Sequence, residues 1–108
     1  MKNKISARKL KHKITFLTQN QEQANDWTIK FGVFSCASYI KPNISQLFDD
    51  AQFGNLINHT YMLFACRYHS DIDKSMRIEF QGNFFAIRKI TNLDQKAQYI
   101  EIIAIQVA

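Results

Sequence analysis

The sequence predicts a mainly β protein, a small antiparallel β-barrel or sandwich of about six strands with one short helix or ordered loop inserted between strands 2 and 3. Three observations favour this class. Apolar and polar residues alternate with a period of two in most segments, as in strands with one buried face. Aromatic and β-branched residues are concentrated in those segments. Strong breakers are rare, with three Gly and one Pro, so the turns must rely on Asn, Asp and Ser.

The length and composition favour a single domain over residues 1–108. A chain of 108 residues buries roughly two thirds of its unfolded surface on folding, enough for one core. Hydrophobic residues make up 46% and charged residues 21% of the sequence, which argues against disorder and against a fibrous protein. No apolar run approaches the roughly 18 residues of a membrane span, and no apolar signal core follows the basic N-terminus. We therefore expect a cytoplasmically made protein without a membrane partner.

The first two strands are predicted at residues 10–17 and 27–40. One face of the first carries Leu10, His12, Ile14 and Phe16, and the other carries Lys11, Lys13 and Thr15. The polar segment QNQEQAND, residues 19–26, joins the strands as a loop or long hairpin connection. The second strand begins with Trp27, Ile29, Phe31 and Val33 on one face and then changes phase. Because the change occurs beside Gly32, it predicts a β-bulge or bend there.

A break in the β pattern follows the second strand. Pro42 ends that strand because it lacks a ladder donor. Apolar residues at near-helical spacing over residues 44–57 then predict a short amphipathic helix or an ordered loop, capped by Asn43 or Ser45. The third strand is predicted at residues 59–69, where apolar side chains occupy both alternating sets, so both faces should be at least partly covered.

Three more strands are predicted at residues 76–80, 84–90 and 99–107. Gln81, Gly82 and Asn83 form a hairpin turn between the first two of them, where Gly82 supplies a positive φ without steric cost. In the last strand, one alternating set opposes the other: Ile100, Ile102, Ala104 and Gln106 against Glu101, Ile103, Ile105 and Val107.

The positive charge is concentrated at the N-terminus. The formal net charge is +5, and six of the 14 basic residues lie in the first 13 positions: Lys2, Lys4, Arg8, Lys9, Lys11 and Lys13. The rest of the chain is nearly balanced, with eight Lys and Arg (14 less six) against nine Asp and Glu. We interpret residues 1–9 as a flexible basic arm for an acidic partner surface or nucleic acid. The alternative is a solvated terminus that only aids solubility.

The residues that suggest chemistry favour structural roles. Cys36 and Cys66 are expected to be reduced, mostly buried thiols, and neither has a nearby base or Gly-rich oxyanion turn in the sequence. The histidines, His12, His59 and His69, show no metal-ligand spacing. We therefore expect no catalytic residue, no metal and no cofactor.

Several phenylalanines raise the possibility of a base-stacking platform on an OB-like barrel. They are Phe31, Phe34, Phe64, Phe80, Phe84 and Phe85. We expect core positions for them, because aromatic strand residues in a small domain usually fill its interior. Phe84 and Phe85 are adjacent and must face opposite ways, so one of them is expected to be exposed at a subunit interface.

The order and spacing of these elements over nearly the whole chain resemble the phage head-tail joining family, whose members are also called head-closure, stopper or head-tail adaptor proteins. The resemblance is carried by KLKHKITFLTQ, by Trp27, by VFSCASYIKP, by the block NHTYMLFACRYHSDIDKSMRIEFQGNFFAIRKITNLD, and by YIEIIAI. The chain departs from the family in QNQEQAND, where a glycine-rich loop is common, and in the compact KPNISQ. These departures concern loop lengths and the choice of partner.

The resemblance implies a structural, non-enzymatic subunit of a bacteriophage or prophage virion. Such subunits form a ring under the portal and adaptor, close the DNA-filled head and offer a surface to the tail proteins. It also implies that residues 42–58 face the central channel and contact passing DNA, with a set of side chains turned toward it: Asn43, Ile44, Gln46, Asp49, Asp50, Gln52 and Asn55. The alternative function is a small basic OB-like nucleic-acid-binding module.

Overall fold

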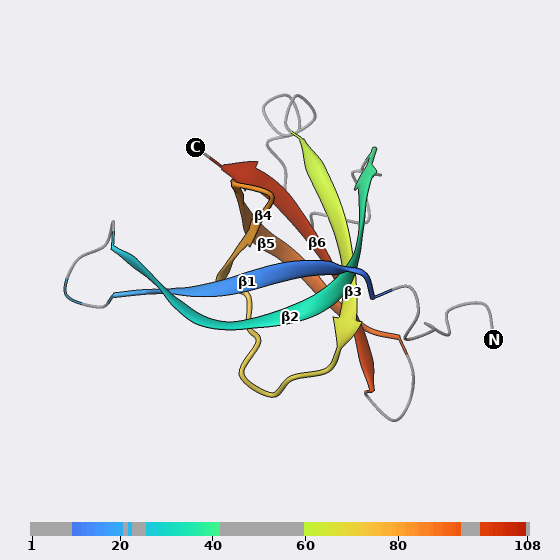
Figure 1. Cartoon of the computed structure of the whole chain (residues 1–108), viewed down its shortest axis with the longest axis horizontal. Helices are drawn as coiled ribbons and strands as arrows, with labels where there is room; N and C mark the ends of the chain where they lie inside the picture. Colours follow the sequence, from blue (N-terminus) through green and yellow to red (C-terminus); the bar gives the residue numbers. More distant parts are fainter. Residues whose placement is uncertain (1–9, 21, 23–25, 42–59, 94–97, 108) are drawn as a thin grey trace.

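The described part of the chain is a closed antiparallel β-barrel. A computed structural model describes residues 10–20, 22, 26–41, 60–93 and 98–107. These residues form β1 (His12–Gln19), β2 (Trp27–Ile40), β3 (Tyr61–Arg67), β4 (Arg77–Phe80), β5 (Asn83–Asn92) and β6 (Tyr99–Val107). The strand order around the barrel is β1-β2-β3-β6-β5-β4, and β4 returns to pair with β1 (Figure 1).

The predicted fold class is confirmed, and closure of the sheet selects the barrel over the sandwich. The predicted and observed strands agree closely, and the bounds of β6 coincide. The helix or ordered loop expected at residues 44–57 lies outside the described residues. The described residues contain no helix, and therefore none long and apolar enough to cross a membrane.

β1 and β2 form a long hairpin whose tip extends beyond the rest of the barrel (Figure 1). β1 pairs with β4 only from Thr15 to Leu17, and β2 pairs with β3 only from Ser35 to Ile40. Toward the tip the hairpin is therefore a two-stranded ribbon. Across its end the Asn20 N–H donates to the Asp26 carbonyl oxygen at 2.7 Å.

A β-bulge lies in β2, but not at the predicted residue. The register with β1 shifts between Phe16, which pairs with Phe31, and Leu17, which pairs with Ile29. Lys30 is thus the extra residue of the bulge. The prediction of a phase change beside Gly32 is wrong, because the inward-facing set continues past that glycine: Phe31, Val33 and Ala37 pack against the core, and Ser35 is buried.

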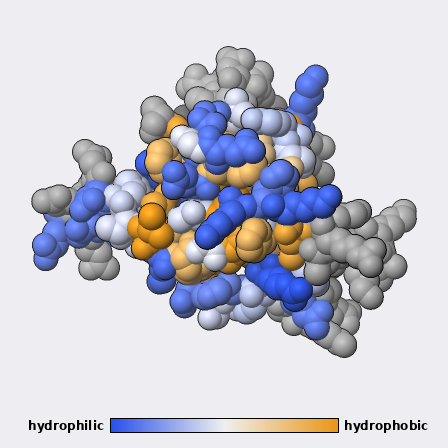
Figure 2. Space-filling view, viewed as in Figure 1, coloured by the Kyte–Doolittle hydropathy of each residue, from blue (hydrophilic) through white to orange (hydrophobic). Residues whose placement is uncertain are grey.

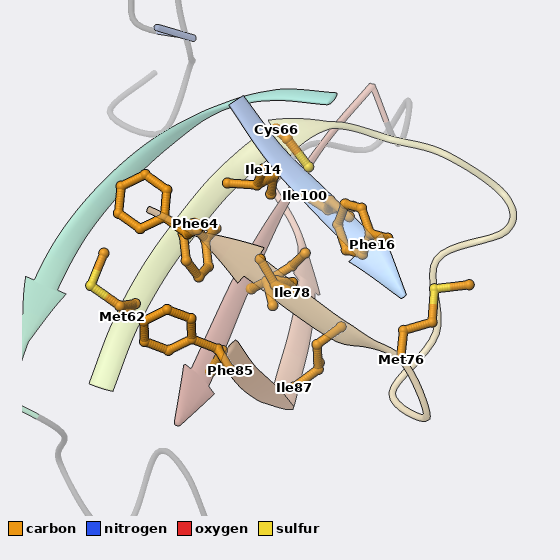
Figure 3. Packing of buried hydrophobic residues seen from close by; sticks show 13 residues of the cluster. Ile14, Phe16, Met62, Phe64, Cys66, Met76, Ile78, Phe85, Ile87 and Ile100 are labelled. Atoms are coloured by element: carbon orange, nitrogen blue, oxygen red, sulfur yellow. The ribbon is translucent and has the colours of Figure 1, made fainter. Parts of the chain in front are cut away.

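The core fills the barrel interior with side chains from five strands and the β3–β4 connection. It consists of Ile14, Phe16, Met62, Phe64, Cys66, Met76, Ile78, Phe80, Phe85, Ile87, Ile100, Ile102 and Ala104. Figure 3 shows these side chains pointing toward one another from the surrounding strands. Phe64 is central, with its ring edge-on to Phe80 and Phe85 at centroid distances of 5.5 and 5.7 Å. Truncating such a side chain to Ala typically costs about 3–5 kcal/mol.

Some apolar side chains are also covered on the outer face of the sheet. Tyr61 of β3 and Ile105 of β6 pair directly and are 1% and 4% exposed, with Ile40 and Ala86 packed against them. The prediction that both faces of the third strand are covered is confirmed. Burial raises the pKa of the Tyr61 hydroxyl, while nearby Arg88 lowers it to a smaller extent.

The β4–β5 hairpin turn is confirmed at the predicted residues. Phe80 pairs with Asn83, and both intervening residues have positive φ angles, 52° at Gln81 and 81° at Gly82. Two such residues define a type I′ turn, whose twist matches that of the strands that it joins. This turn fixes the register between β4 and β5.

The turn gives a test of stability. Gly82→Ala is expected to lower the melting temperature by about 5 °C or more, because Ala in the left-handed region costs about 1–2 kcal/mol. A Cβ at Gly82 would meet no atom within 4 Å, so the loss would come from the backbone alone. Gln81→Asn is the matched control and should melt at or above the wild-type temperature, since Asn favours positive φ. A Gly82→Ala variant that melts like the wild type would contradict this turn.

Candidate functional site

Only part of the predicted partner-binding set lies within the described residues. Lys2, Lys4, Arg8 and Lys9 are outside them, and so is the whole segment expected to face a channel, residues 42–58. Lys11 and Lys13 are described, and both are exposed at the beginning of β1. The site is therefore built from these two lysines and the surface next to them.

Lys13 lies beside an exposed aromatic ring. It pairs with Phe34 of β2, whose side chain is 59% exposed. The Lys13 side chain also lies over Gly32, with its Cε 3.0 Å from the position that a glycine Cβ would take. The start of the hairpin thus carries two exposed lysines, with the Lys13 side chain over Gly32 and its pairing partner Phe34 exposed.

The bulge at Lys30 creates a second exposed apolar position on the same face. Ile29 pairs with Leu17 and Phe34 with Lys13, and these partners share the outer face of β1, since the intervening Ile14 and Phe16 point into the core. Five positions separate Ile29 from Phe34, so a regular strand would put them on opposite faces. The extra residue restores them to one face. Ile29 is 70% exposed.

Sequence reasoning misplaced both of these residues. It put Ile29 on one face with Phe31 and counted Phe34 among the core aromatics. Both predictions are wrong. The bulge turns Ile29 outward, and Phe34 faces outward because it pairs with Lys13, whose side chain is on the outer face of β1. Figure 2 shows hydrophobic side chains among hydrophilic ones over the face that β1 and β2 form, and a mainly hydrophilic projecting end.

The projecting end of the hairpin carries exposed carboxylates, those of Glu22 and Asp26. Asn20 bonds to the Asp26 carboxylate and to the Glu22 backbone: its Nδ2 donates to Asp26 Oδ2 at 3.2 Å, and its Oδ1 accepts from the Glu22 N–H at 2.9 Å. The Arg77 guanidinium lies 4.4 Å from the centre of the neighbouring Trp27 ring. This cation–π contact, of a kind worth about 0.5–1 kcal/mol when exposed, joins the hairpin to β4.

The connection between β3 and β4, residues 68–76, packs against the hairpin. His69 stacks on Phe31 with ring centroids 4.2 Å apart and an interplanar angle of 19°, and Phe31 contacts Phe16 of the core. Ile72 also packs against the core. Two turns shape the connection. In the first, the Ile72 N–H donates to the His69 carbonyl oxygen, and in the second, the Met76 N–H donates to the Asp73 carbonyl oxygen.

Asp73 holds the second of these turns. Its Oδ1 accepts a hydrogen bond from the Ser75 N–H at 2.8 Å and another from the Ser75 hydroxyl. The Ser75 hydroxyl and then the Ser75 N–H lower the pKa of the Asp73 carboxyl. Desolvation opposes them to a smaller extent, and Lys30 makes the smallest contribution, which also lowers the pKa. The carboxylate form is therefore the one that orders the turn.

This arrangement predicts a pH dependence. Ser75→Ala removes the hydroxyl donor and should raise the pKa of Asp73 toward its ordinary value. Because the folded pKa is the lower one, the stabilisation is complete above the ordinary value, about 4, and is lost as the pH falls through the folded pKa. NMR titration of the Asp73 carboxyl carbon measures this value. Ser70→Ala is the control and should leave the titration unchanged, and an unchanged titration in Ser75→Ala would contradict the assignment.

The cysteines are thiols, as predicted, and no disulfide joins them. Cys66 lies in the core, and its burial, with a smaller effect of Cys36, raises the pKa of its thiol to about 12. Cys66 therefore remains protonated at neutral pH and is a poor nucleophile.

The histidines and acidic residues were considered as metal ligands. His12 packs edge-on against Phe80 at 5.6 Å and His69 stacks on Phe31, while His59 lies outside the described residues. Within the ranges that the structure describes, no group of three or more His, Cys, Asp or Glu residues is placed to hold a metal ion.

Among the residues that the structure describes, the phenylalanines do not form a row of exposed rings. Phe64, Phe80 and Phe85 are buried, and His69 covers Phe31. Phe84 is 37% exposed while Phe85 is 2% exposed, as expected for adjacent strand residues. Phe34 and Phe84 are the exposed pair, and they belong to β2 and β5, with β1 and β4 between them. The strands therefore display single apolar rings beside charged groups, a surface suited to docking a protein.

The fold and surface are those of a small closed β-barrel with exposed apolar side chains. The phage head completion protein family matches the chain over residues 5–107. The chain therefore belongs to this family of phage head structural proteins, which confirms the resemblance found in the sequence. No curated protein sequence matches the chain.

Two solved structures share the fold. A chain in the virion of a native gene transfer agent particle superposes with a TM-score of 0.58 and 13% identity, over 91% of this chain and 96% of that one. The solution structure of protein SF1141 from Shigella flexneri 2a gives a TM-score of 0.62 and 19% identity, over 96% and 98% of the two chains. At these identities the likeness concerns the fold.

Proposed function

We propose that this head completion protein is a non-enzymatic connector subunit, which assembles as a ring beneath the portal and adaptor, closes the DNA-filled head and receives the tail. The observation that carries the proposal is the family match over residues 5–107. The barrel agrees with it, because its interior is filled with apolar side chains and its exposed apolar residues lie on the outer surface.

The basic arm is proposed to bind an acidic neighbouring ring or the DNA that passes it. Its sequence carries Lys2, Lys4, Arg8 and Lys9, and Lys11 and Lys13 continue the positive charge onto the exposed surface of β1. Charge attraction of this kind is long-ranged at low salt and is screened over about 10 Å at 0.1 M salt. Attachment through the arm should therefore weaken as salt is added.

Residues 42–58 are proposed to face the central channel. Support comes from the family and from the position of this segment, which connects β2 to β3 at the ends where Ile40 pairs with Tyr61. The side chains proposed to meet DNA are Asn43, Ile44, Gln46, Asp49, Asp50, Gln52 and Asn55.

The experiment is sedimentation of the purified protein with portal-bearing, DNA-filled heads of the same phage, compared with its binding to free single-stranded DNA. We expect the protein to sediment with filled heads and to bind single-stranded DNA weakly. Tight, salt-sensitive binding to single strands without attachment to heads would overturn the connector function and favour the nucleic-acid-binding module.

The same assay separates the two proposed contact regions. Replacing Lys2, Lys4, Arg8 and Lys9 with Ala should reduce attachment at low salt, whereas a control with four other exposed lysines replaced, Lys30, Lys41, Lys74 and Lys89, should attach normally. Deleting residues 43–54 should leave attachment intact but let DNA leak from the heads. If both alanine variants attached equally well, the proposed role of the arm would be wrong. If heads that carry the deletion variant stayed sealed, the proposed role of residues 42–58 would be wrong.

A further inference from the structure

The outer face of the β1–β2 hairpin carries an apolar strip with charges of opposite sign at its two ends. The strip, here called the hairpin strip, consists of Ile29, Gly32 and Phe34, which share one face because of the bulge at Lys30. Ile29 and Phe34 are 70% and 59% exposed. Burial of these two side chains in a contact with another molecule would be favourable.

The acidic end of the strip is the projecting tip of the hairpin. Glu22 and Asp26 are exposed there, and Asn20 bonds to the Asp26 carboxylate and to the backbone N–H of Glu22. Ile29 follows three positions after Asp26 in the sequence. Neither β3 nor β4 pairs with Asn20, Glu22 or Asp26, so the exposed Glu22 and Asp26 can meet a neighbouring molecule without a change in strand pairing.

The basic end lies at the start of β1, where Lys11 and Lys13 are exposed and Lys13 pairs with Phe34. β1 contains eight residues, so its two ends, seven steps apart, are separated by about 23 Å at 3.3 Å per step. The acidic tip of one molecule therefore cannot reach its own basic end. It can reach the basic end of another copy, and the two ends match in charge and in their exposed apolar side chains.

We propose that the hairpin tip of one subunit docks on the basic start of β1 of the next, with Ile29 near Phe34 and with Glu22 and Asp26 near Lys11 and Lys13. This inference rests on the proposed ring and names its subunit contact. The two surfaces are different, so the contact is head-to-tail, and repetition closes a ring if the rotation per subunit allows it. Apolar burial provides attraction, and the charges set the orientation.

A second copy fits this strip better than DNA does. The carboxylates at the tip repel phosphates, whereas they attract the lysines at the other end of an identical chain. A two-fold pair, with two strips packed face to face in opposite directions, also matches the charges. Such a pair contains only two subunits, however, whereas head-to-tail contacts build larger multimers. The size of the cross-linked product therefore distinguishes the two arrangements.

The test is disulfide cross-linking of subunits attached to filled heads. Asp26→Cys and Lys11→Cys are combined with Cys36→Ala, while Cys66 stays because it is buried. Cysteines at these positions lie at opposite ends of β1, more than about 20 Å apart, and cannot join within one chain, since a disulfide requires Cα atoms within about 7 Å. Head-to-tail docking predicts a ladder of multimers on a non-reducing gel after mild oxidation. Each single-cysteine variant is a control and should give no ladder.

The outcomes separate the contact from the function. A cross-linked dimer without higher multimers, or no cross-link on heads that bear the protein, would overturn the head-to-tail contact and leave the connector function in place. If the wild-type protein itself failed to bind heads, the connector function would be wrong, and the ring contact, which rests on it, would be wrong as well.

Charge reversal gives a second test that leaves the cysteines unchanged. Glu22→Lys with Asp26→Lys makes both ends of the strip basic, and Lys11→Glu with Lys13→Glu makes both ends acidic. Each variant alone should lose assembly on heads at low salt, and an equimolar mixture should recover it, because alternating subunits restore every contact. Assembly by either variant alone, or no recovery in a mixture of folded variants, would overturn the proposal.

Discussion

Closure of the sheet by the four-residue strand β4 is the constraint on which the rest of the structure depends. β4 pairs with β1 on one side and β5 on the other, so the sheet that would otherwise end at these strands becomes a barrel. Both of its neighbouring connections position it. The type I′ turn at Gln81 and Gly82 sets its register with β5, and residues 68–76 lead into it with Ile72 and Met76 packed in the core.

A closed barrel of this size leaves little room for function inside. Its interior is filled by the core cluster, and the polar exception among the described residues, Ser35, places its hydroxyl 3.1 Å from the Ala65 carbonyl oxygen. The features available for contact with other molecules therefore lie on the outer surface of the barrel. The bulge at Lys30 brings Ile29 and Phe34 to one outer face, while Trp27 and Arg77 hold the hairpin to the barrel.

Local periodicity was sufficient to predict the strands, because each strand alternates between the core and the outer face. Glycine chemistry was sufficient for the turn at Gly82. The bulge was missed because its position depends on the register with β1: the apolar run suggested Gly32, whereas the shift occurs at Lys30. The contacts of Trp27 with Arg77 and of Phe31 with His69 join residues far apart in the sequence and leave no local pattern.

The candidate site was predicted only in part, for similar reasons. A run of lysines is visible in any sequence, so Lys11 and Lys13 were found. Glu22 and Asp26 are single carboxylates in a polar connection, and they gain meaning only when the hairpin places them beyond the barrel (Figure 1). Ile29 and Phe34 looked like core residues because the exposure of Ile29 depends on the bulge and that of Phe34 on its pairing with the outward-facing Lys13. A pattern scan that allowed one extra residue at each strand position would have shown both on one face.

The measurement that tests the central claim most directly is the yield of tailed, DNA-containing particles from a phage in which this protein is absent. The account predicts that heads fill with DNA but lose it on isolation and carry no tails, and that supplying the protein restores stable, tailed particles. Normal yields of tailed, DNA-filled particles without the protein would contradict a role in completing the head.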